Sequence, residues 1–125
     1  MAMSDYSVNG IGELVVTLPL DSTTKNTIGK NYDAACGNAV ALTANNTVGY
    51  GSSGDALFGI IKGVEHDGAA AIQVKGFAVD IPSTGSLTVG GNVAVDGTGK
   101  VKTAESGTAV VTSADTSNNV CDILL

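Results

Sequence analysis

Glycines and clusters of Asn, Asp, Ser and Thr interrupt every apolar stretch of this sequence within about ten residues. An amphipathic helix needs apolar residues at i, i+3, i+4 and i+7, and stretches this short rarely sustain that spacing. Glycine supplies 17 residues, without the triplet period of collagen and with only two prolines. The sequence therefore predicts short β-strands joined by tight turns.

The apolar residues available for a core are mostly small. Hydrophobic residues make up 43% of the chain but aromatic residues only 4%, so Val, Ile, Leu and Ala must fill the interior. A chain of 125 residues fits one ordinary domain. We predict an all-β fold, a small antiparallel β-barrel or β-sandwich, with one domain over residues 13–125 and an extended N-terminal arm over residues 1–12.

The first predicted strand spans Glu13–Leu20, where Leu14, Val16, Leu18 and Leu20 alternate with the residues of the other face. Pro19 favours an edge strand or the end of a strand, because proline cannot donate to a sheet ladder. Residues 21–30 are polar and contain little core material. We predict an exposed loop there.

Turn residues divide the rest of the chain into hairpins. Asn45-Asn46 and residues 96–99 each separate two short apolar runs, and Asp67-Gly68 is a dipeptide favoured in type I′ turns. The predicted strands are Asn38–Thr43 and Thr47–Tyr50, Leu57–Glu65 and Ala69–Ile81, Asn92–Val95 and Lys100–Thr103, and finally Thr108–Thr112 and Val120–Leu125.

The apolar face of one of these strands switches at Gly76. Ile72 and Val74 are the apolar positions before it, whereas Phe77 and Val79 are the apolar positions after it. A strand of period two cannot change faces without an irregularity. Gly76 is therefore predicted to lie at a β-bulge, or at a bend where the strand passes between two sheets.

Two of the hairpins resemble each other. Gly37-Asn38 precedes the first, and Gly91-Asn92 precedes the second, and a Val-Ala pair, a turn and a further Val follow in both. Either the chain contains a duplicated unit, or two hairpins written in Gly, Asn, Val and Ala look alike by chance. The sequence leaves both explanations open.

The charge of the chain restricts its partners. Only 14% of the residues are charged, the six basic residues are all lysine, and the net charge is −6. Such a surface repels phosphate backbones, so we expect no nucleic-acid partner. No apolar run approaches the roughly 20 residues of a membrane helix, and residues 1–10 lack the blocks of a signal peptide. We expect a protein made in the cytosol without a membrane partner.

The side chains that enzymes use are scarce. His66 is the only histidine and lies at a turn, and there is no arginine. Cys36 and Cys121 are far apart in the sequence, and we expect reduced, buried thiols, although a single bridge between them remains open. A cysteine nucleophile needs an activating base. We expect neither a catalytic residue nor a metal site formed by these groups.

Two motif matches have simpler explanations. Residues 49–54 satisfy G-x-G-x-x-G, but no amphipathic helix follows to bind a pyrophosphate at its N-terminus. Asp96, Asp115 and Asp122 are scattered among turn residues and do not form a calcium-loop pattern. We expect no cofactor.

Three stretches together resemble the small capsid decoration (cement, or head-stabilising) proteins of tailed bacteriophages. They are residues 54–68 (GDALFGIIKGVEHDG), residues 71–77 (AIQVKGF) and residues 91–101 (GNVAVDGTGKV). The resemblance covers roughly residues 37–104 and consists of turns and small apolar residues, with no catalytic signature. It implies a β-tulip-like module that docks on the outer surface of a capsid and clamps neighbouring subunits of the major capsid protein.

The same resemblance implies a homo-oligomer, with a trimer favoured and a dimer possible, located on the outer surface of the virion after synthesis in the bacterial cytoplasm. We expect the arm to contact the shell through Ala2, Met3, Ser4, Asp5 and Tyr6. The alternative is a ligand- or carbohydrate-binding β-module of a phage tail or a cell-surface protein. Sugar platforms usually expose aromatic rings, and Tyr6, Tyr32 and Tyr50 are far apart in the sequence.

Overall fold

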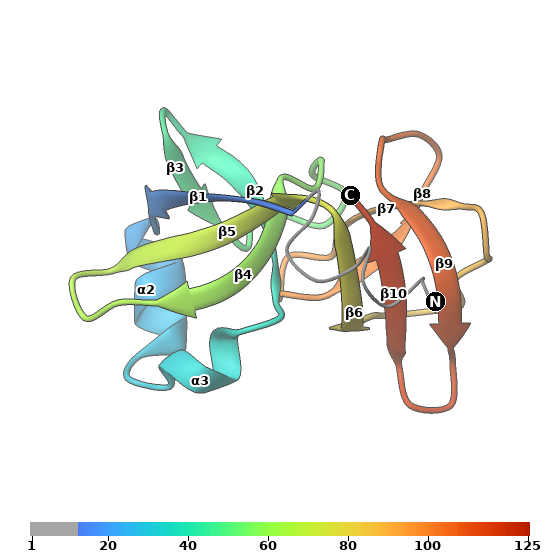
Figure 1. Ribbon diagram of the computed structural model, residues 1–125. Coiled ribbons are helices and arrows are strands. Elements are labelled where there is room, and N and C mark those ends of the chain that lie inside the picture. The colour runs from blue at the N-terminus through green and yellow to red at the C-terminus, as the bar shows by residue number, and fades with distance from the viewer. Residues whose placement is uncertain (1–12) are drawn as a thin grey trace, which may run out of the picture.

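The computed structural model describes residues 13–125, and the predicted arm lies outside them. The chain forms two five-stranded antiparallel sheets side by side (Figure 1). The prediction of an all-β fold is confirmed. In the described part of the chain neither sheet closes into a continuous barrel, and only an isolated bridge joins the end of the first strand to the opposite edge strand.

The first sheet has the strand order β1-β5-β4-β2-β3, and the second has the order β6-β10-β9-β7-β8. The strands of the first sheet are β1 (Leu14–Pro19), β2 (Ala39–Ala44), β3 (Thr47–Gly49), β4 (Gly59–Val64) and β5 (Ala69–Lys75). The strands of the second sheet are β6 (Phe77–Pro82), β7 (Asn92–Val95), β8 (Val101–Ala104), β9 (Val110–Asp115) and β10 (Val120–Leu124). β1 is an edge strand and ends at Pro19, as predicted.

The predicted hairpins are all present, with one difference in turn type. At Asp67-Gly68 only the glycine has a positive φ, of 88°, so the turn is not type I′. The amide of Gly68 donates to the carbonyl of Glu65 over 2.9 Å, and the amide of Glu65 donates to the carbonyl of Ala69 over 2.8 Å. This is a three-residue loop with glycine in the left-handed position, another common hairpin connection.

Gly76 is the point at which the chain leaves the first sheet for the second. β5 ends at Lys75 and β6 begins at Phe77 in the other sheet, and Gly76 has a φ of 106° (Figure 1). The predicted passage between two sheets is confirmed. The buried amide of Gln73 stabilises the crossing, because its Nε2 donates to the carbonyls of Lys75 and Phe77, each over 3.2 Å.

The prediction of an exposed loop over residues 21–30 is wrong, because helix α2 (Ser22–Ile28) occupies most of this segment. Asp21 caps it by accepting from the amide of Thr24 over 2.7 Å, and Gly29 ends it with a φ of 61°. Thr24 and Ile28 are buried against the first sheet. A second short helix, α3 (Tyr32–Ala35), follows.

Asp21 and Thr24 fix α2 on β3. The hydroxyl of Thr24 accepts from the amide of Tyr50 over 3.0 Å, and the Oδ2 atom of Asp21 accepts from the hydroxyl of Thr43 over 2.8 Å. A side chain at Gly49 would collide with Asp21, so the close approach of the helix requires glycine there. Partial burial raises the pKa of Asp21, but hydrogen bonds from Thr24 and Thr43 outweigh it, and the net pKa is lowered.

The second sheet repeats the topology of the first strand by strand. Adding five to each strand number of the first order gives the second order. The β4–β5 ladder shifts register directly after Ile61, and the β9–β10 ladder shifts register directly after Val111, which takes the corresponding place in β9. The two prolines of the sequence, Pro19 and Pro82, occupy corresponding ends of β1 and β6. These agreements support the duplicated unit over chance similarity, and we call β1 to β5 the first unit and β6 to β10 the second unit.

In each unit an isolated bridge joins the residue after the first strand to the strand at the opposite edge of the same sheet, and the two bridges correspond. Leu20 forms a parallel bridge with Val48, and Ser83 forms one with Val101. The amide of Leu20 donates to Gly68 over 2.9 Å, and the amide of Ser83 donates to Asn119 over the same distance. Each unit therefore curls around its own inner face.

Two apolar clusters fill the molecule. One lies between the inner face of the first sheet and the helices, with Ile61 and Ile72 at its centre. The other fills the inner face of the second sheet around Val111 and Ile123, and it takes Ile60 from the outer face of the first sheet. This second cluster holds the two units together.

Candidate functional site

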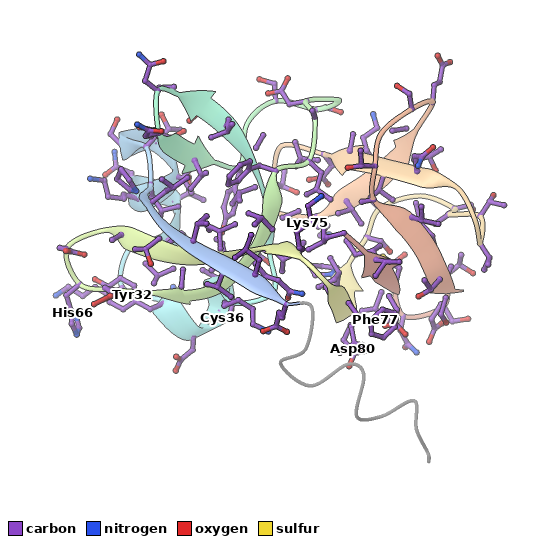
Figure 2. The ribbon with its side chains drawn as sticks, turned by 45° about the horizontal axis from the view of Figure 1, so that its top comes forward. Tyr32, Cys36, His66, Lys75, Phe77 and Asp80 are labelled. Atoms are coloured by element: carbon purple, nitrogen blue, oxygen red, sulfur yellow. The ribbon has the colours of Figure 1, made fainter. Side chains whose placement is uncertain are left out.

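His66 lies in the hairpin loop between β4 and β5, as the sequence predicts. Its ring packs edge-on against Tyr32 with the centroids 5.2 Å apart (Figure 2). A shallow cavity of about 300 Å³ opens beside it, lined by residues such as Lys25, Ile28 and Asp67. In residues 13–125 no group of three His, Cys, Asp or Glu side chains gathers that could hold a metal ion. The contact with Tyr32 gives His66 a packing role.

The two thiols are in different environments. Both are free, but Cys36 is exposed whereas Cys121 is buried, so the expectation of burial is wrong for Cys36. The Sγ of Cys36 donates to the carbonyls of Lys62, over 3.4 Å, and Tyr32, over 3.6 Å. Burial and the neighbouring Asp122 raise the pKa of Cys121 to about 11. Cys121 is therefore protonated and unreactive at neutral pH.

The glycine-rich stretch over residues 49–54 lies between β3 and β4 and contacts the second unit. The amide of Gly54 donates to the carbonyl of Val95 over 2.9 Å, and the Nζ of Lys102 donates to the Oγ of Ser53 over 3.0 Å. A side chain at Gly97 would lie 3.2 Å from the amide nitrogen of Ser53. The stretch thus packs closely against the β7–β8 hairpin, and Gly97 of that hairpin permits the close approach.

The three aspartates singled out from the sequence bind backbone groups. Asp96 accepts from the amides of Thr98 and Lys100, over 2.7 and 3.2 Å. Hydrogen bonds from the side chain and the backbone of Asn118 lower the pKa of the exposed Asp115. Asp122 accepts from the amide of Asp80 over 3.0 Å. Asp96 is a turn residue as expected, whereas Asp115 is the last residue of β9 and accepts from the turn that follows it, and Asp122 lies within β10.

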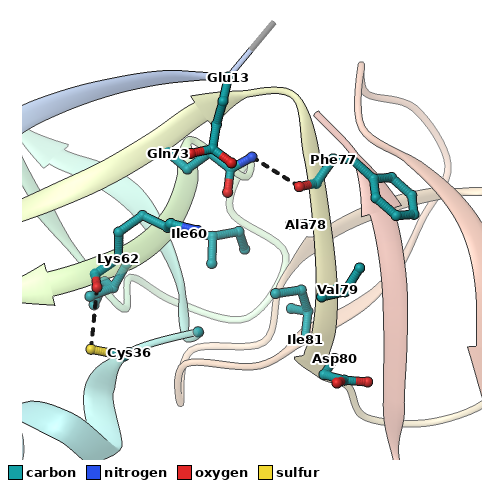
Figure 3. A pocket seen from close by; sticks show the side chains of 12 residues that line it. Glu13, Cys36, Ile60, Lys62, Gln73, Phe77, Ala78, Val79, Asp80 and Ile81 are labelled. Atoms are coloured by element: carbon teal, nitrogen blue, oxygen red, sulfur yellow. Dashed lines mark hydrogen bonds between the residues drawn. The ribbon is translucent and has the colours of Figure 1, made fainter. Parts of the chain in front are cut away.

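A groove of about 550 Å³ lies between the first sheet and β6 (Figure 3). Ile60 and Ile81 are buried in its apolar part, and Glu13, Lys62 and Asp80 carry its charges. The remaining lining residues are Cys36, Gly37, Ile61, Gln73, Phe77, Ala78 and Val79. β6 is an edge strand, which pairs with β10 among the described residues. An apolar strip beside an open strand edge suits an extended peptide segment.

Glu13, the first described residue, lines this groove. The candidate contact residues, Ala2 to Tyr6, precede it and lie outside the described residues. Sequence reasoning missed the groove itself, because it forms from β4, β5 and β6 only after the chain crosses at Gly76. The face switch at Gly76 was the one signal that pointed to this region.

Comparisons with known proteins identify no family for the chain: no protein-family model matches it, and no curated protein is significantly similar to it. Within residues 13–125 there is also no helix of the length and apolarity that crossing a membrane requires. The site must therefore be interpreted from its own geometry.

Proposed function

We propose that this chain is a structural virion protein that binds the outer surface of a tailed-phage capsid and stabilises contacts between subunits of the major capsid protein. The observation that carries the proposal is the repeated construction of the molecule, with two units of one topology in a single chain. A shell of identical subunits presents the same surface at every neighbouring subunit. A chain with two similar halves can bind two of these surfaces at once, which raises its affinity by avidity.

The groove supplies a route for the N-terminal residues. An extended segment of twelve residues spans at most about 40 Å, so residues 1–12 can reach well beyond Glu13 to a neighbouring subunit. We propose that Ala2 to Tyr6 contact the shell. We also propose that the groove and the open edge of β6 receive an extended segment of the N-terminal residues by strand addition. The net charge of −6 favours the outer surface of the capsid over the packaged DNA.

The alternative of a carbohydrate-binding module finds less support in the placement of the tyrosines. Tyr50 is buried at 8% exposure, and Tyr32 packs against His66. In the described residues the tyrosines therefore form no exposed row of rings on which a sugar could stack.

Co-sedimentation with purified, expanded capsids of the encoding phage tests the proposal. The full chain should sediment with the capsids, a variant lacking residues 1–8 should bind more weakly, and His66→Ala should bind as the full chain does. Circular dichroism checks that each variant is folded. If the full chain stays in the supernatant, the capsid function is wrong. If the truncated variant binds equally well, residues 1–8 are not part of the contact.

A further inference from the structure

The start of β1 lies beside the crossing at Gly76. β5 ends at Lys75 and β6 begins at Phe77, so these two strands form one continuous run from the first sheet into the second. β1 is antiparallel to β5, and its first residue, Leu14, is the partner of Lys75. An extended segment that precedes Leu14 is therefore directed past Gly76 and along β6.

Glu13 shows where the N-terminal residues join the described chain. Its side chain lines the groove between the first sheet and β6. Figure 3 shows Glu13 at the end of the groove where Phe77 begins β6, with Asp80 toward the other end. The twelve residues before Glu13 thus meet the rest of the chain at the groove itself.

The open edge of β6 presents backbone groups to this groove. In an antiparallel ladder, successive residues point their amide and carbonyl alternately toward the partner strand and away from it. Gly76 points toward β10, because its carbonyl accepts from the amide of the last residue over 2.8 Å. Asp80 also points toward β10, because its amide donates to the carboxylate of Asp122 over 3.0 Å. Between them, Phe77 and Val79 are the residues that point away from β10.

A contact with the first sheet supports this orientation. The carbonyl of Phe77 accepts from the Nε2 of Gln73 over 3.2 Å, so it faces the first sheet and not β10. Val79 follows at the strand period and lines the groove. Its amide is therefore a donor that the edge of β6 offers to an added strand.

The ladder of β1 and β5, continued past the crossing, gives the register of such a strand. Leu14 opposes Lys75, so each step back from Leu14 corresponds to one step forward from Lys75, and Ile11 comes opposite Ala78. Ala78 is buried in the apolar cluster of the second unit. Alternation from Glu13, which lines the groove, also directs the side chain of Ile11 into the groove. Two arguments thus agree on Ile11.

The length and composition of the segment suit this placement. Five extended residues span about 17 Å, close to the length of the six-residue β6. Gly10 and Gly12 flank Ile11, so the large apolar side chain of this stretch is the one directed into the groove. The glycines come opposite Phe77 and Val79, where they place no side chain beside these two.

We propose that residues 8–12 continue β1 backward as an antiparallel edge strand on β6, with the side chain of Ile11 against Ala78 and the amide of Val79 donating to the added strand. Residues 1–7 then extend at most about 20 Å beyond this strand. The contact of Ala2 to Tyr6 with the shell therefore lies near the end of β6 at Pro82.

This inference rests on the proposed function, which seats N-terminal residues in the groove, and it names the residues, their direction and their register. The pairing itself does not depend on capsid binding. Its test therefore uses the purified chain alone, and its failure is a separate result from a failure to bind capsids.

Hydrogen exchange at the amide of Val79, followed by NMR on the full chain, tests the pairing. We expect slow exchange that does not depend on protein concentration. Ile11→Asp should speed it about 10-fold or more, because a carboxylate buried against the apolar cluster opens the added strand. Ser7→Asp is the matched control, since it adds the same charge before the paired segment, and it should leave the exchange at Val79 unchanged. The amide of Ala78, which points toward β10, should be unaffected in both variants.

Fast exchange at Val79 in the unmodified chain overturns the pairing, and so do equal rates in Ile11→Asp and Ser7→Asp. Slow exchange that is lost on dilution assigns the edge to a second copy of the chain and overturns it as well. A variant lacking residues 1–6 should keep Val79 protected while its co-sedimentation with capsids weakens. If the full chain protects Val79 but stays in the supernatant, the pairing is supported and only the capsid function is contradicted.

Discussion

The two units share one topology but cover their inner faces differently. In the first unit, helices α2 and α3 bring Ile28 and Ala35 onto the inner face. The inner face of the second unit is covered by the outer face of the first sheet, through Ala39, Ala41 and Ile60. The segment after β6 forms no helix, and Leu87 is its buried contribution. One unit is thus closed by its own connecting segment, and the other by its neighbour.

This difference makes the second unit depend on the first for its core. The first unit contains all the parts of its core cluster within residues 16–74, whereas the second needs Ile60 and its neighbours from the first. Losing the first unit would expose the core of the second, and losing the second would expose Ala39, Ala41 and Ile60 of the first. We therefore expect the two units to unfold together.

The largest effect should come from truncating the corresponding isoleucines of the two cores. Ile72 and Ile123 are both 0% exposed and take the same place in β5 and β10. Ile72→Ala and Ile123→Ala should each lower the free energy of unfolding by about 2–5 kcal/mol, through lost burial and the cavity left behind. Urea denaturation followed by circular dichroism should show one transition in each variant, shifted to lower urea.

A second transition would contradict the expectation that the two units unfold together. If Ile123→Ala produced two steps, with only one of them shifted, the units would be independent and the shared cluster would not couple them. Exposed Ser113→Ala, on β9, is the control and should change stability by less than about 0.5 kcal/mol.

A smaller effect is expected at Gln73 and Leu124, which take corresponding places in β5 and β10 but are 1% and 48% exposed. Gln73→Met keeps the length of the side chain but removes the donor to the carbonyls of Lys75 and Phe77. Leaving buried polar groups unpaired should cost about 1–3 kcal/mol. Leu124→Gln places the residue of the first unit in the second, at an exposed position, and should change the stability of the monomer by less than about 0.5 kcal/mol. Thermal unfolding at low protein concentration compares the two, and equal losses would contradict the proposed role of Gln73 at the crossing.

The smallest effect concerns Cys121, whose counterpart in the first unit is Ala70. Its pKa in the folded chain is about 11, against an ordinary value of 9.0, because burial disfavours the thiolate. The unfolded chain therefore releases this proton first, so the contribution to stability is full below pH 9 and is lost as the pH rises toward 11. Cys121→Ala should show a weaker decline of the urea midpoint over this range. An identical decline in both proteins would show that other groups cause it.

The hairpins were predictable from the sequence because their signals are local. Asp96 and the glycines at 97 and 99 form a turn through contacts within four residues of one another. Helix α2 was missed for the opposite reason. Its seven residues include only Thr24 and Ile28 as buried positions, which is too few to give an apolar period. The cap at Asp21 and the stop at Gly29 were the available signals.

The groove and the exposure of Val79 could not be derived from the sequence, because each depends on how the chain packs. Val79 and Ile81 have similar side chains and lie two residues apart, yet Val79 is 55% exposed and Ile81 is 2% exposed. The irregular register between β6 and β10 separates them, and no pattern in the sequence marks it.

The amino-acid sequence by itself determined the all-β class, the hairpins and the passage at Gly76, since turn chemistry and period-two patterns act over a few neighbouring residues. Only the tertiary structure decided that the second unit repeats the first, that helices cover one inner face and a sheet covers the other, and that Gln73 is buried where Leu124 is exposed. The physical reason is that burial depends on which surfaces meet, and surfaces meet through contacts between residues far apart in the chain.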